Sequence, residues 1–330
     1  MTKHKKVLGL FGAAAFVAAA AFSAQAQDDG EAPAVEVKPR PAELMPLSPK
    51  SLLLDVVQTG ERFVAVGDRG AIILSADGQA WEQVNVPVRA ALTAVYFADP
   101  QHGWAVGHDA AIVATADGGK TWALQNFQPE LEKPLLDVLF LDASRGFAVG
   151  AYGLLLGTED AGASWTEVVA KNIQEDVDEV HFNSITRLAN GNLFIAGEFG
   201  MLAVSGDEGK TWTRLDSPYD SSFFGALPVG ERGALVYGLR GNAYLTQDVR
   251  SGRWTKLDTD SVASMFGGTV LPGGERVMVG LNGVIFMVDA SGAVRSLQTP
   301  AGTPLSAAIP LNGGLLAVGE SGVQQLATLQ

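Results

Sequence analysis

The feature that most constrains this chain is a repeat of about forty residues that runs along its length. Each repeat holds a short apolar run that ends in glycine, as in "FVAVG", "GWAVG" and "GFAVG", and these glycines recur 39 to 47 residues apart. They are Gly67, Gly107, Gly150, Gly197, Gly238, Gly280 and Gly319. A period of ~40–45 residues with several short strands per unit is typical of β-propeller blades. The sequence therefore predicts one blade-like unit repeated seven times.

Four strands can be read within one repeat. An apolar run such as 92–97 comes first, and the run that ends in Val-Gly follows it. A third run such as 71–75 comes next, and a fourth such as 81–86 starts at a tryptophan. The runs are short, rich in β-branched and aromatic residues, and separated by Gly and Asp, which favours strands over helices. We predict an all-β fold, a seven-bladed β-propeller with four-stranded blades, over residues 51–330.

The last repeat ends after its third strand, at Gln330. Residues 27–50 are rich in proline and charge, which is typical of a linker or an extended arm. This arm contains "AELMPL" at 42–47, and an outermost strand tolerates Pro46 because its free side needs no N–H donor. We expect the arm to supply the missing outer strand of the last blade and so to close the ring. A disordered arm is the alternative.

The N-terminus resembles an export signal. Three lysines within residues 3–6 precede an apolar run from Val7 to Phe22, and "AQA" at 24–26 offers a small-x-small cleavage site. We predict a signal peptide over 1–26 that is cleaved after Ala26, and a periplasmic location for the mature chain. Cysteine is absent, which excludes a thiolate metal site and a lipid anchor on cysteine.

The charge balance narrows the class of partner. The formal net charge is −13, and removal of the leader with its three lysines makes it −16. A strongly acidic surface repels polyanions, so nucleic acid and anionic lipid surfaces are poor partners. We expect a monomer whose partner is a protein.

A second motif recurs at the turn between the third and fourth strands. "TADGGKTW" at 115–122 follows the pattern S/T-x-D-x-G-x-S/T-W, which returns at 158–165 and 205–212 and, one residue shorter, at 75–81. An Asp carboxylate can accept hydrogen bonds from backbone N–H groups just after it and so fix a turn. A group that acts once per molecule would not be copied around a ring, so we assign these residues a structural role. They are Asp77, Trp81, Asp117, Trp122, Asp160, Trp165, Asp207 and Trp212.

This pattern resembles the BNR/Asp-box propellers, and among them most closely the photosystem II stability/assembly factor family and its relatives in non-photosynthetic bacteria. The phrases "GWAVG", "GFAVG" and "DGGKTW" carry the resemblance, which spans roughly 51–330. It implies a non-enzymatic seven-bladed protein of the lumen or periplasm that binds membrane-protein intermediates and helps them assemble. The non-photosynthetic relatives are linked with transporters of the RND/MMPL type, which suggests that class of partner.

A sialidase-like propeller, which would bind or cleave glycans, is the main alternative because it shares the Asp motif. Sialidases need three arginines for the substrate carboxylate and a tyrosine nucleophile beside a glutamate. Arginine is sparse here, and neither Tyr152 nor Tyr244 has an obvious glutamate nearby in the sequence. The histidines form no H-x-x-x-H pair, and the acidic stretch 174–181 lacks the alternating frame of a calcium loop. We expect no cofactor, no metal and no catalytic residue.

The turns between the second and third strands should all lie on one face, around the mouth of the central channel. Turn tips with only a structural role could all be Asn or Asp, yet here they include bulky and charged residues. Mixed charge with aromatics is what an interaction surface tends to present. The alternative is that exposed tips vary freely. Our candidate partner-binding residues are Arg69, His108, Asp109, Tyr152, Glu198, Phe199 and Arg240.

Overall fold

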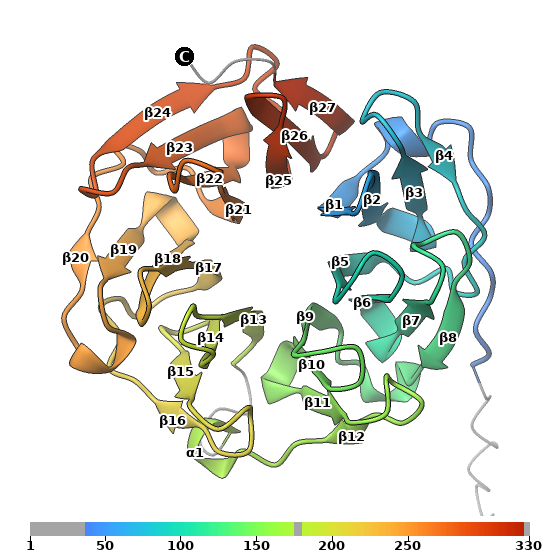
Figure 1. Cartoon of the computed structure of the whole chain (residues 1–330), viewed down its shortest axis with the longest axis horizontal. Coiled ribbons are helices and arrows are strands. Elements are labelled where there is room, and N and C mark those ends of the chain that lie inside the picture. The colour runs from blue at the N-terminus through green and yellow to red at the C-terminus, as the bar shows by residue number, and fades with distance from the viewer. Residues whose placement is uncertain (1–36, 175–179, 327–330) are drawn as a thin grey trace, which may run out of the picture. The chain divides into compact units, whose positions relative to one another are not determined.

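The strands pair in chain order into seven antiparallel sheets. The computed structural model describes residues 37–174 and 180–326, and all seven sheets belong to one unit, Lys38–Gln330. Within that part of the chain six sheets have four strands and the last has three. In Figure 1 the sheets stand like blades around an axis, with one innermost strand of each sheet facing it. The predicted seven-bladed propeller is confirmed.

The strand bounds follow the predicted repeat. Blades one to three comprise β1 (Leu53–Thr59), β2 (Arg62–Gly67), β3 (Ile72–Ser75) and β4 (Glu82–Gln83); β5 (Leu92–Phe97), β6 (Gly103–Gly107), β7 (Ile112–Thr115) and β8 (Ala123–Asn126); β9 (Leu135–Phe140), β10 (Gly146–Gly150), β11 (Leu155–Thr158) and β12 (Thr166–Glu167). Blades four and five comprise β13 (Phe182–Arg187), β14 (Leu193–Gly197), β15 (Leu202–Ser205) and β16 (Thr213–Arg214); β17 (Phe223–Val229), β18 (Gly233–Gly238), β19 (Ala243–Thr246) and β20 (Thr255–Lys256). Blades six and seven comprise β21 (Met265–Val270), β22 (Arg276–Gly280), β23 (Val284–Val288) and β24 (Val294–Gln298); β25 (Leu305–Leu311), β26 (Gly314–Gly319) and β27 (Gly322–Leu326).

Helices are short and lie between the strands. The 3-10 turns are η1 (Ser48–Lys50), η2 (Asp68–Gly70), η3 (His108–Ala110), η4 (Pro129–Leu131), η5 (Ala151–Gly153), η6 (Leu239–Gly241), η7 (Val249–Ser251) and η8 (Leu281–Gly283), and α1 spans Lys171–Gln174. No helix in the described residues is long and apolar enough to cross a membrane.

The core is divided among the junctions between neighbouring blades. Seven hydrophobic clusters each join two adjacent blades, and the last of them joins the seventh blade to the first. Because the second strand of a blade is covered on both faces, β2 is buried from Phe63 to Gly67, which explains its unbroken apolar run. The outermost strands are two to five residues long and mostly exposed. Apolar burial between blades therefore holds the ring together.

Five tryptophans pack at five of these junctions. Each immediately precedes the fourth strand of its blade and packs in a cluster with the blade before it, as Trp122 does with Val64 and Leu74 of the first blade. The five are Trp81, Trp122, Trp165, Trp212 and Trp254. The junctions between blades five and six and between blades six and seven hold no tryptophan among their clustered residues.

Every innermost strand carries a bulge near its start. In β1 the pairing with β2 passes from Leu53 directly to Asp55, so that Leu54 is the extra residue. The same shift occurs in the other six blades. The extra residues are Leu54, Thr93, Leu136, Asn183, Phe224, Phe266 and Ser306. A bulge re-aims the neighbouring side chains, and here it does so at one level in all seven blades.

The predicted closing strand is not found in the arm. Residues 42–47 form no strand; instead Ala42 donates a hydrogen bond to the carbonyl of Val86 (3.0 Å) and Met45 to Oε1 of Gln83 (2.7 Å), both in the first blade. The repeated prolines of the arm remove the N–H donors that a ladder needs. The expectation that this arm completes the last blade is therefore wrong for the described residues.

The arm nevertheless lies at the junction where the ring closes. A Cβ built on Gly322, which has a φ of +78°, would lie 2.1 Å from the carbonyl oxygen of Pro49, so only glycine fits beneath η1. Gln325 of β27 donates to the carbonyl of Gly78 in the first blade (2.8 Å). Leu53 and Phe63 pack against Leu316. In the described residues side-chain packing therefore joins the first and last blades, without a shared sheet.

Candidate functional site

The turns between second and third strands share one strained conformation in six of the seven blades. In the first blade the Ala71 N–H donates to the carbonyl of Asp68 (3.1 Å), and Arg69 and Gly70 have φ values of 55° and 71°, as in a type I′ turn. In six blades the first central residue has a positive φ: Arg69, Asp109, Tyr152, Phe199, Arg240 and Asn282. Only the sixth blade uses the favoured Asn-Gly pair, at 282–283.

Bulky residues are poor choices for this conformation. A non-glycine residue in the left-handed region costs of order ~1–3 kcal/mol, and Asn or Asp tolerate it best. Tyr152 and Phe199 nevertheless occupy it. The backbone packs closely at the base of two of these turns, because a Cβ on Gly200 would lie 2.1 Å from the carbonyl of Tyr219, and one on Gly241 would lie 2.0 Å from that of Ser261. The turns of the fourth and fifth blades therefore present Phe199 and Arg240 from a closely packed base.

The seven candidate residues all lie on this face, which we call the mouth. Arg69, His108 and Arg240 are exposed, while Asp109 and Glu198 are partly buried. Tyr152 is 46% exposed and Phe199 is 62% exposed, which is unusual for aromatic side chains. Tyr152 lies in the turn of the third blade, and Glu198 and Phe199 lie in the turn of the fourth blade.

The structure brings part of this set together through a residue that the sequence did not single out. The His181 ring lies 4.9 Å from the Tyr152 ring, edge to face, and its Nδ1 lies 3.6 Å from Oε2 of Glu198. Arg69 forms an ion pair with its neighbour Asp68 (3.5 Å), and Arg240 lies in the turn of the fifth blade. The mouth therefore has one cluster at blades three and four and separate charges elsewhere.

Two shallow depressions flank these turns. One lies beside Phe199 and is bounded by Arg214, Asp216 and Tyr219, with a volume of about 580 Å³. The other lies beside Arg240 and Val262, also about 580 Å³, and Val262 is 85% exposed. Each combines an exposed apolar side chain with carboxylates and an arginine. Residues 175–179 of the acidic stretch 174–181 fall outside the described residues.

The channel holds two carboxylates that link neighbouring blades. Asp55 Oδ2 accepts a hydrogen bond from the Val95 N–H of the next blade (2.9 Å), and its Oδ1 accepts one from Val56 (2.8 Å). Asp137 repeats this with Ile185 of the next blade (2.8 Å) and Val138 (2.8 Å). Both line a channel of about 370 Å³ formed by the innermost strands. We call Asp55 and Asp137 the channel aspartates.

The channel raises the pKa of both carboxyls. Desolvation raises the pKa of Asp55 to about 7, against the Val95 hydrogen bond that lowers it, and repulsion from Asp137 adds to the rise. Desolvation likewise raises the pKa of Asp137 to about 6. None of the described residues that line the channel is lysine, arginine or histidine. The lining therefore offers no arginine triad for a sugar carboxylate and no basic partner for the two acids.

A signal for the channel aspartates was present in the sequence. "LLDV" occurs at 53–56 and again at 135–138, at the same position of two innermost strands. A charged residue that interrupts a buried strand twice at one register position is an exception to the apolar pattern. Because the motif occurs in two of the seven repeats, aligning the repeats did not reveal that the two aspartates face one channel.

The opposite face carries the aspartate corners. Asp117 Oδ1 accepts from the Thr121 N–H (2.9 Å), its Oδ2 accepts from the Thr121 hydroxyl (2.7 Å), and Trp122 Nε1 donates to Gly119 (2.8 Å). Asp160 and Asp207 repeat the carboxylate contacts, whereas Asp77 accepts only from backbone N–H groups and Ser75. We call Asp77, Asp117, Asp160 and Asp207 the corner aspartates.

These bonds hold the corner carboxylates in their charged form. Partial burial opposes the shift at Asp117, but hydrogen bonds from Thr121 and Thr115 lower its pKa to about 2. The Thr211 hydroxyl and N–H lower the pKa of Asp207 to about 2 as well. Each carboxylate closes its own turn.

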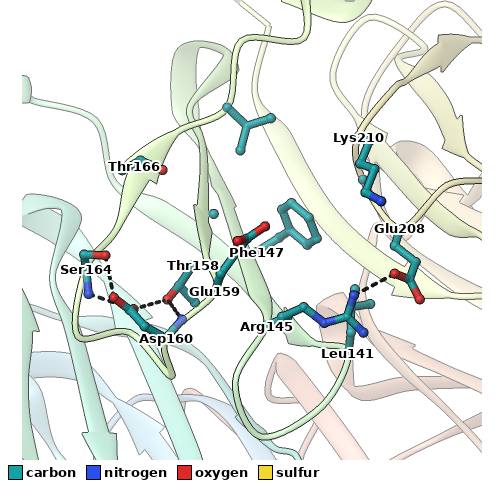
Figure 2. A pocket seen from close by; sticks show the side chains of 13 residues that line it. Leu141, Arg145, Phe147, Thr158, Glu159, Asp160, Ser164, Thr166, Glu208 and Lys210 are labelled. Carbon is teal, nitrogen blue, oxygen red and sulfur yellow. Dashed lines mark hydrogen bonds and ion pairs between the residues drawn. The ribbon is translucent and has the colours of Figure 1, made fainter.

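A groove on this face lies between blades three and four. It measures about 530 Å³ and is drawn in Figure 2, where Arg145 points from one blade toward Glu208 of the next. Arg145 Nη1 lies 2.6 Å from Glu208 Oε2, and its Nε lies 2.9 Å from Asp142. Asp160, at the edge of the groove, is engaged in its own corner with Ser164. Arg145 and Asp160 are therefore already engaged, while Glu159 and Lys210 also line the groove.

The described residues contain no group of three or more His, Asp or Glu side chains placed to hold a metal ion. Two of the histidines in the described residues contact a carboxylate: His102 contacts Asp99 (2.8 Å), and His181 contacts Glu198.

The sequence matches one family model. A model described as photosynthesis system II assembly factor YCF48 matches residues 72–133 and 123–295, which together span well over half of the chain. The photosystem II stability/assembly factor HCF136 of Cyanidioschyzon merolae is 35% identical over 83 residues, 23% of this chain and 19% of the relative. The assembly protein Ycf48 of Thermosynechococcus vestitus is 35% identical over 60 residues, 18% of this chain and 17% of the relative. The alignments thus span under a fifth of these relatives.

Solved structures share the fold over most of the chain. A structure described as YCF48 bound to D1 peptide has a TM-score of 0.68 at 15% identity and covers 90% of this chain and 99% of that one. YCF48 from Cyanidioschyzon merolae gives 0.67 at 16%, covering 85% and 97%. The WD40 propeller of Doa1 gives 0.65 at 12%, covering 83% and 92%. At these identities the likeness concerns the fold alone.

Proposed function

The chain belongs to the family of photosystem II assembly factor YCF48, and from that premise we propose that it is a non-catalytic docking propeller that helps a membrane protein complex assemble. We propose that it acts in the periplasm, because residues 1–26 have the pattern of an export signal. The names of its relatives support an assembly role, and one relative has been solved with a D1 peptide bound.

The observation that carries the proposal is the strain at the mouth. Tyr152 and Phe199 stand in a backbone conformation that Asn would adopt at lower cost, as Asn282 does in the sixth blade. Strain of this kind persists where side-chain identity matters more than turn stability. Their exposed rings are of the type that anchors protein interfaces.

We propose that the client presents a peptide segment to the mouth. An apolar side chain of that segment would pack on Phe199 and Tyr152, and its acidic groups would pair with Arg69 and Arg240. Within the class of membrane proteins we propose a transporter of the RND/MMPL type, because non-photosynthetic relatives of this family are linked with such transporters. Away from these two arginines, the protein's own carboxylates around the mouth would repel strongly acidic parts of the client.

The test is capture of the client from membranes of the source organism. A photo-crosslinking residue at position 152 or 199 should give one main membrane-protein adduct, identified by mass spectrometry. Charge reversal of Arg69 and Arg240 together should reduce capture at least tenfold. The matched control is Arg253→Glu, an exposed arginine on the opposite face, which should leave capture unchanged. Equal capture by both variants would contradict the docking face.

A second variant separates binding from folding. Phe199→Asn gives the turn the residue that it prefers, so we expect unchanged or slightly higher stability, by about 0.5 kcal/mol, together with lost capture. A loss of capture in a protein that melts at or above the wild-type temperature cannot be attributed to misfolding. Retention of soluble oligosaccharides, with no membrane partner, would favour a glycan-binding propeller instead.

A further inference from the structure

Four innermost strands are tied to the next blade by a side chain. Asp55 reaches Val95, and Asp137 reaches Ile185, as described above. In the two other blades Thr93 donates to the Leu135 carbonyl (2.8 Å), and Asn183 Nδ2 donates to the Phe223 carbonyl (2.8 Å). Neutral side chains therefore suffice to bridge blades in this channel. Two of the four bridges are nevertheless carboxyl groups, with no basic residue among the described lining to neutralise them.

A third polar group faces the same space. Tyr237 is 4% exposed and lies in β18, yet its hydroxyl reaches the innermost strands: a Cβ on Gly225 would lie 2.3 Å from it, and one on Gly268 would lie 3.0 Å away. Burial raises the pKa of Tyr237, and the charges of Asp137 and Asp55 raise it further, so the three groups share one field. In the described part of the chain no side chain or backbone group is hydrogen-bonded to this hydroxyl. Tyr237 therefore contributes to the channel lining a hydroxyl group that has no hydrogen-bond partner among the described residues.

We propose that the channel binds a primary alkylammonium group, held by Asp55, Asp137 and Tyr237. An ammonium group has three N–H donors and no acceptor, and each of these three side chains offers at least one free acceptor site. Each carboxylate oxygen that already accepts a backbone N–H keeps a second lone pair. The positive charge would neutralise the two acids in a space where charge is costly to leave unpaired.

The mouth side of the site suits the carbon chain of such a ligand. The bulge residues Leu54, Leu136, Phe224 and Phe266 line the channel one step nearer to the mouth than the channel aspartates. The rings of Phe224 and Phe266 lie 5.6 Å apart. Methylene groups can pack on such a collar while the charged head goes deeper, and aromatic faces attract the cation.

Other cations fit less well. Calcium prefers six to eight oxygen ligands and is held by more carboxylates than two. A guanidinium group holds its five N–H donors in one flat fork, whereas the two carboxyls and the hydroxyl come from three different blades around the channel. The ligand could be a free amine or a lysine side chain of a partner, since both present the same group, and the experiment distinguishes these sources.

The first experiment uses the wild-type protein with pentylamine, followed by isothermal titration calorimetry between pH 5.5 and 8. We expect saturable one-site binding, absent for 1-pentanol and for sodium chloride of equal ionic strength. Binding should release protons at pH 6.5, because it favours the ionised form of acids with raised pKa values, and affinity should rise toward pH 8. Asp55, Asp137 and Tyr237 are the titratable groups of the described lining, so proton release reports on them.

Variants then locate the site. Tyr237→Phe removes one hydroxyl and should weaken binding about tenfold, and Asp137→Asn should weaken it at least a hundredfold. Asp258→Asn makes the same charge change outside the channel and should have no effect. If Asp137→Asn does not fold, the proton release and Tyr237→Phe still decide the matter. Absence of saturable binding at 10 mM amine, or equal binding of pentylamine and pentanol, would overturn the proposal.

The source of the group is tested without any client. Free diaminopentane and a blocked tripeptide with a central lysine are titrated in parallel. Tighter binding of the diamine indicates a small-molecule ligand, and tighter binding of the peptide indicates a partner's lysine; both outcomes support an alkylammonium site. Since no membrane protein enters these assays, their failure leaves the docking proposal standing, and failure of capture leaves the channel site standing.

Discussion

The corner aspartates and the channel aspartates are the same type of residue, but their surroundings shift the pKa of the carboxyl in opposite directions. Asp117 lies at the surface and receives hydrogen bonds from its own turn, which lower the pKa of its carboxyl to about 2. Asp55 lies in the channel and bridges two blades, and desolvation raises the pKa of its carboxyl to about 7. The difference teaches that the number of hydrogen bonds does not set the charge state. The cost of removing water from the carboxylate decides it.

The two sets also differ in how they are distributed. The corner is repeated around the ring with small variations, as expected of a device that every blade needs. The channel carboxyl occurs in blades one and three among the described innermost strands, at a position that holds Ala94, Ser184 and Gly225 in other blades. A feature that the fold does not need in each blade is a candidate for function.

The largest effect should come from the tryptophan of a corner. Trp122 is 8% exposed and packs on the first blade, so Trp122→Ala should lower the free energy of unfolding by about 3–5 kcal/mol. Trp165 is less buried, and Trp165→Ala should cost less. Urea unfolding followed by circular dichroism measures both. Equal losses would mean that the depth of burial does not set the contribution of these side chains.

The next effect separates the channel from the corners by pH. Since the channel aspartates have raised pKa values in the folded state, their stabilising contribution is complete below about pH 4 and is lost as pH rises through 6 to 7. Stability should therefore fall by about 2–4 kcal/mol between pH 4.5 and 7.5, less than the full shifts imply because water enters the channel. Asp55→Asn with Asp137→Asn should flatten this slope, and Asp258→Asn should not. A wild-type slope of opposite sign contradicts the assignment.

The corner aspartates should respond in the opposite direction and more weakly. Their lowered pKa values mean that their contribution is present above about pH 4 and is lost as pH falls toward 2. Asp117→Ala at pH 7 should cost about 1–2 kcal/mol, because the Thr121 and Thr115 bonds are lost. Asp248→Ala, whose carboxylate accepts one backbone bond from Arg250, should cost less. Thermal melts at pH 3 and pH 7 compare the two variants.

The smallest effect tests whether bridging and charge are separable in the channel. Thr93→Val removes the hydroxyl that reaches the next blade and keeps the shape, so it should cost about 1 kcal/mol. Because no ionisable group is changed, the cost should be the same at pH 4.5 and pH 7.5. A cost that varies with pH would show that Thr93 is coupled to the channel aspartates, and the contrast drawn above would need revision.

The sequence predicted what the repeat dictates. Blade number, strand order and the aspartate corners follow from patterns that recur seven or four times, so each occurrence supports the others. The arm occurs once, and its prolines were judged against an edge strand without knowledge of the Gln83 side chain that fixes it on the first blade. Single features of this kind depend on contacts between distant segments, which periodicity does not contain.

The candidate site was also predicted only where its residues belong to the repeat. The mouth residues were found because turns repeat, but the strain at Tyr152 and Phe199 is visible only in backbone angles. His181 and Tyr237 were missed because one lies in a loop and the other in a second strand, and both reach neighbouring elements. Neither contact has a signature along the chain.

The bulges at the start of the innermost strands make the channel unusually open to redesign. Each blade contributes one bulge residue at the same depth, and none of these seven side chains belongs to the interblade clusters, so a change there leaves the packing of the blades intact. Replacing Ser306 by a lysine would add a positive charge to the channel lining. The scaffold thus offers seven side-chain positions at one level of the channel that can be changed without altering the packing between the blades.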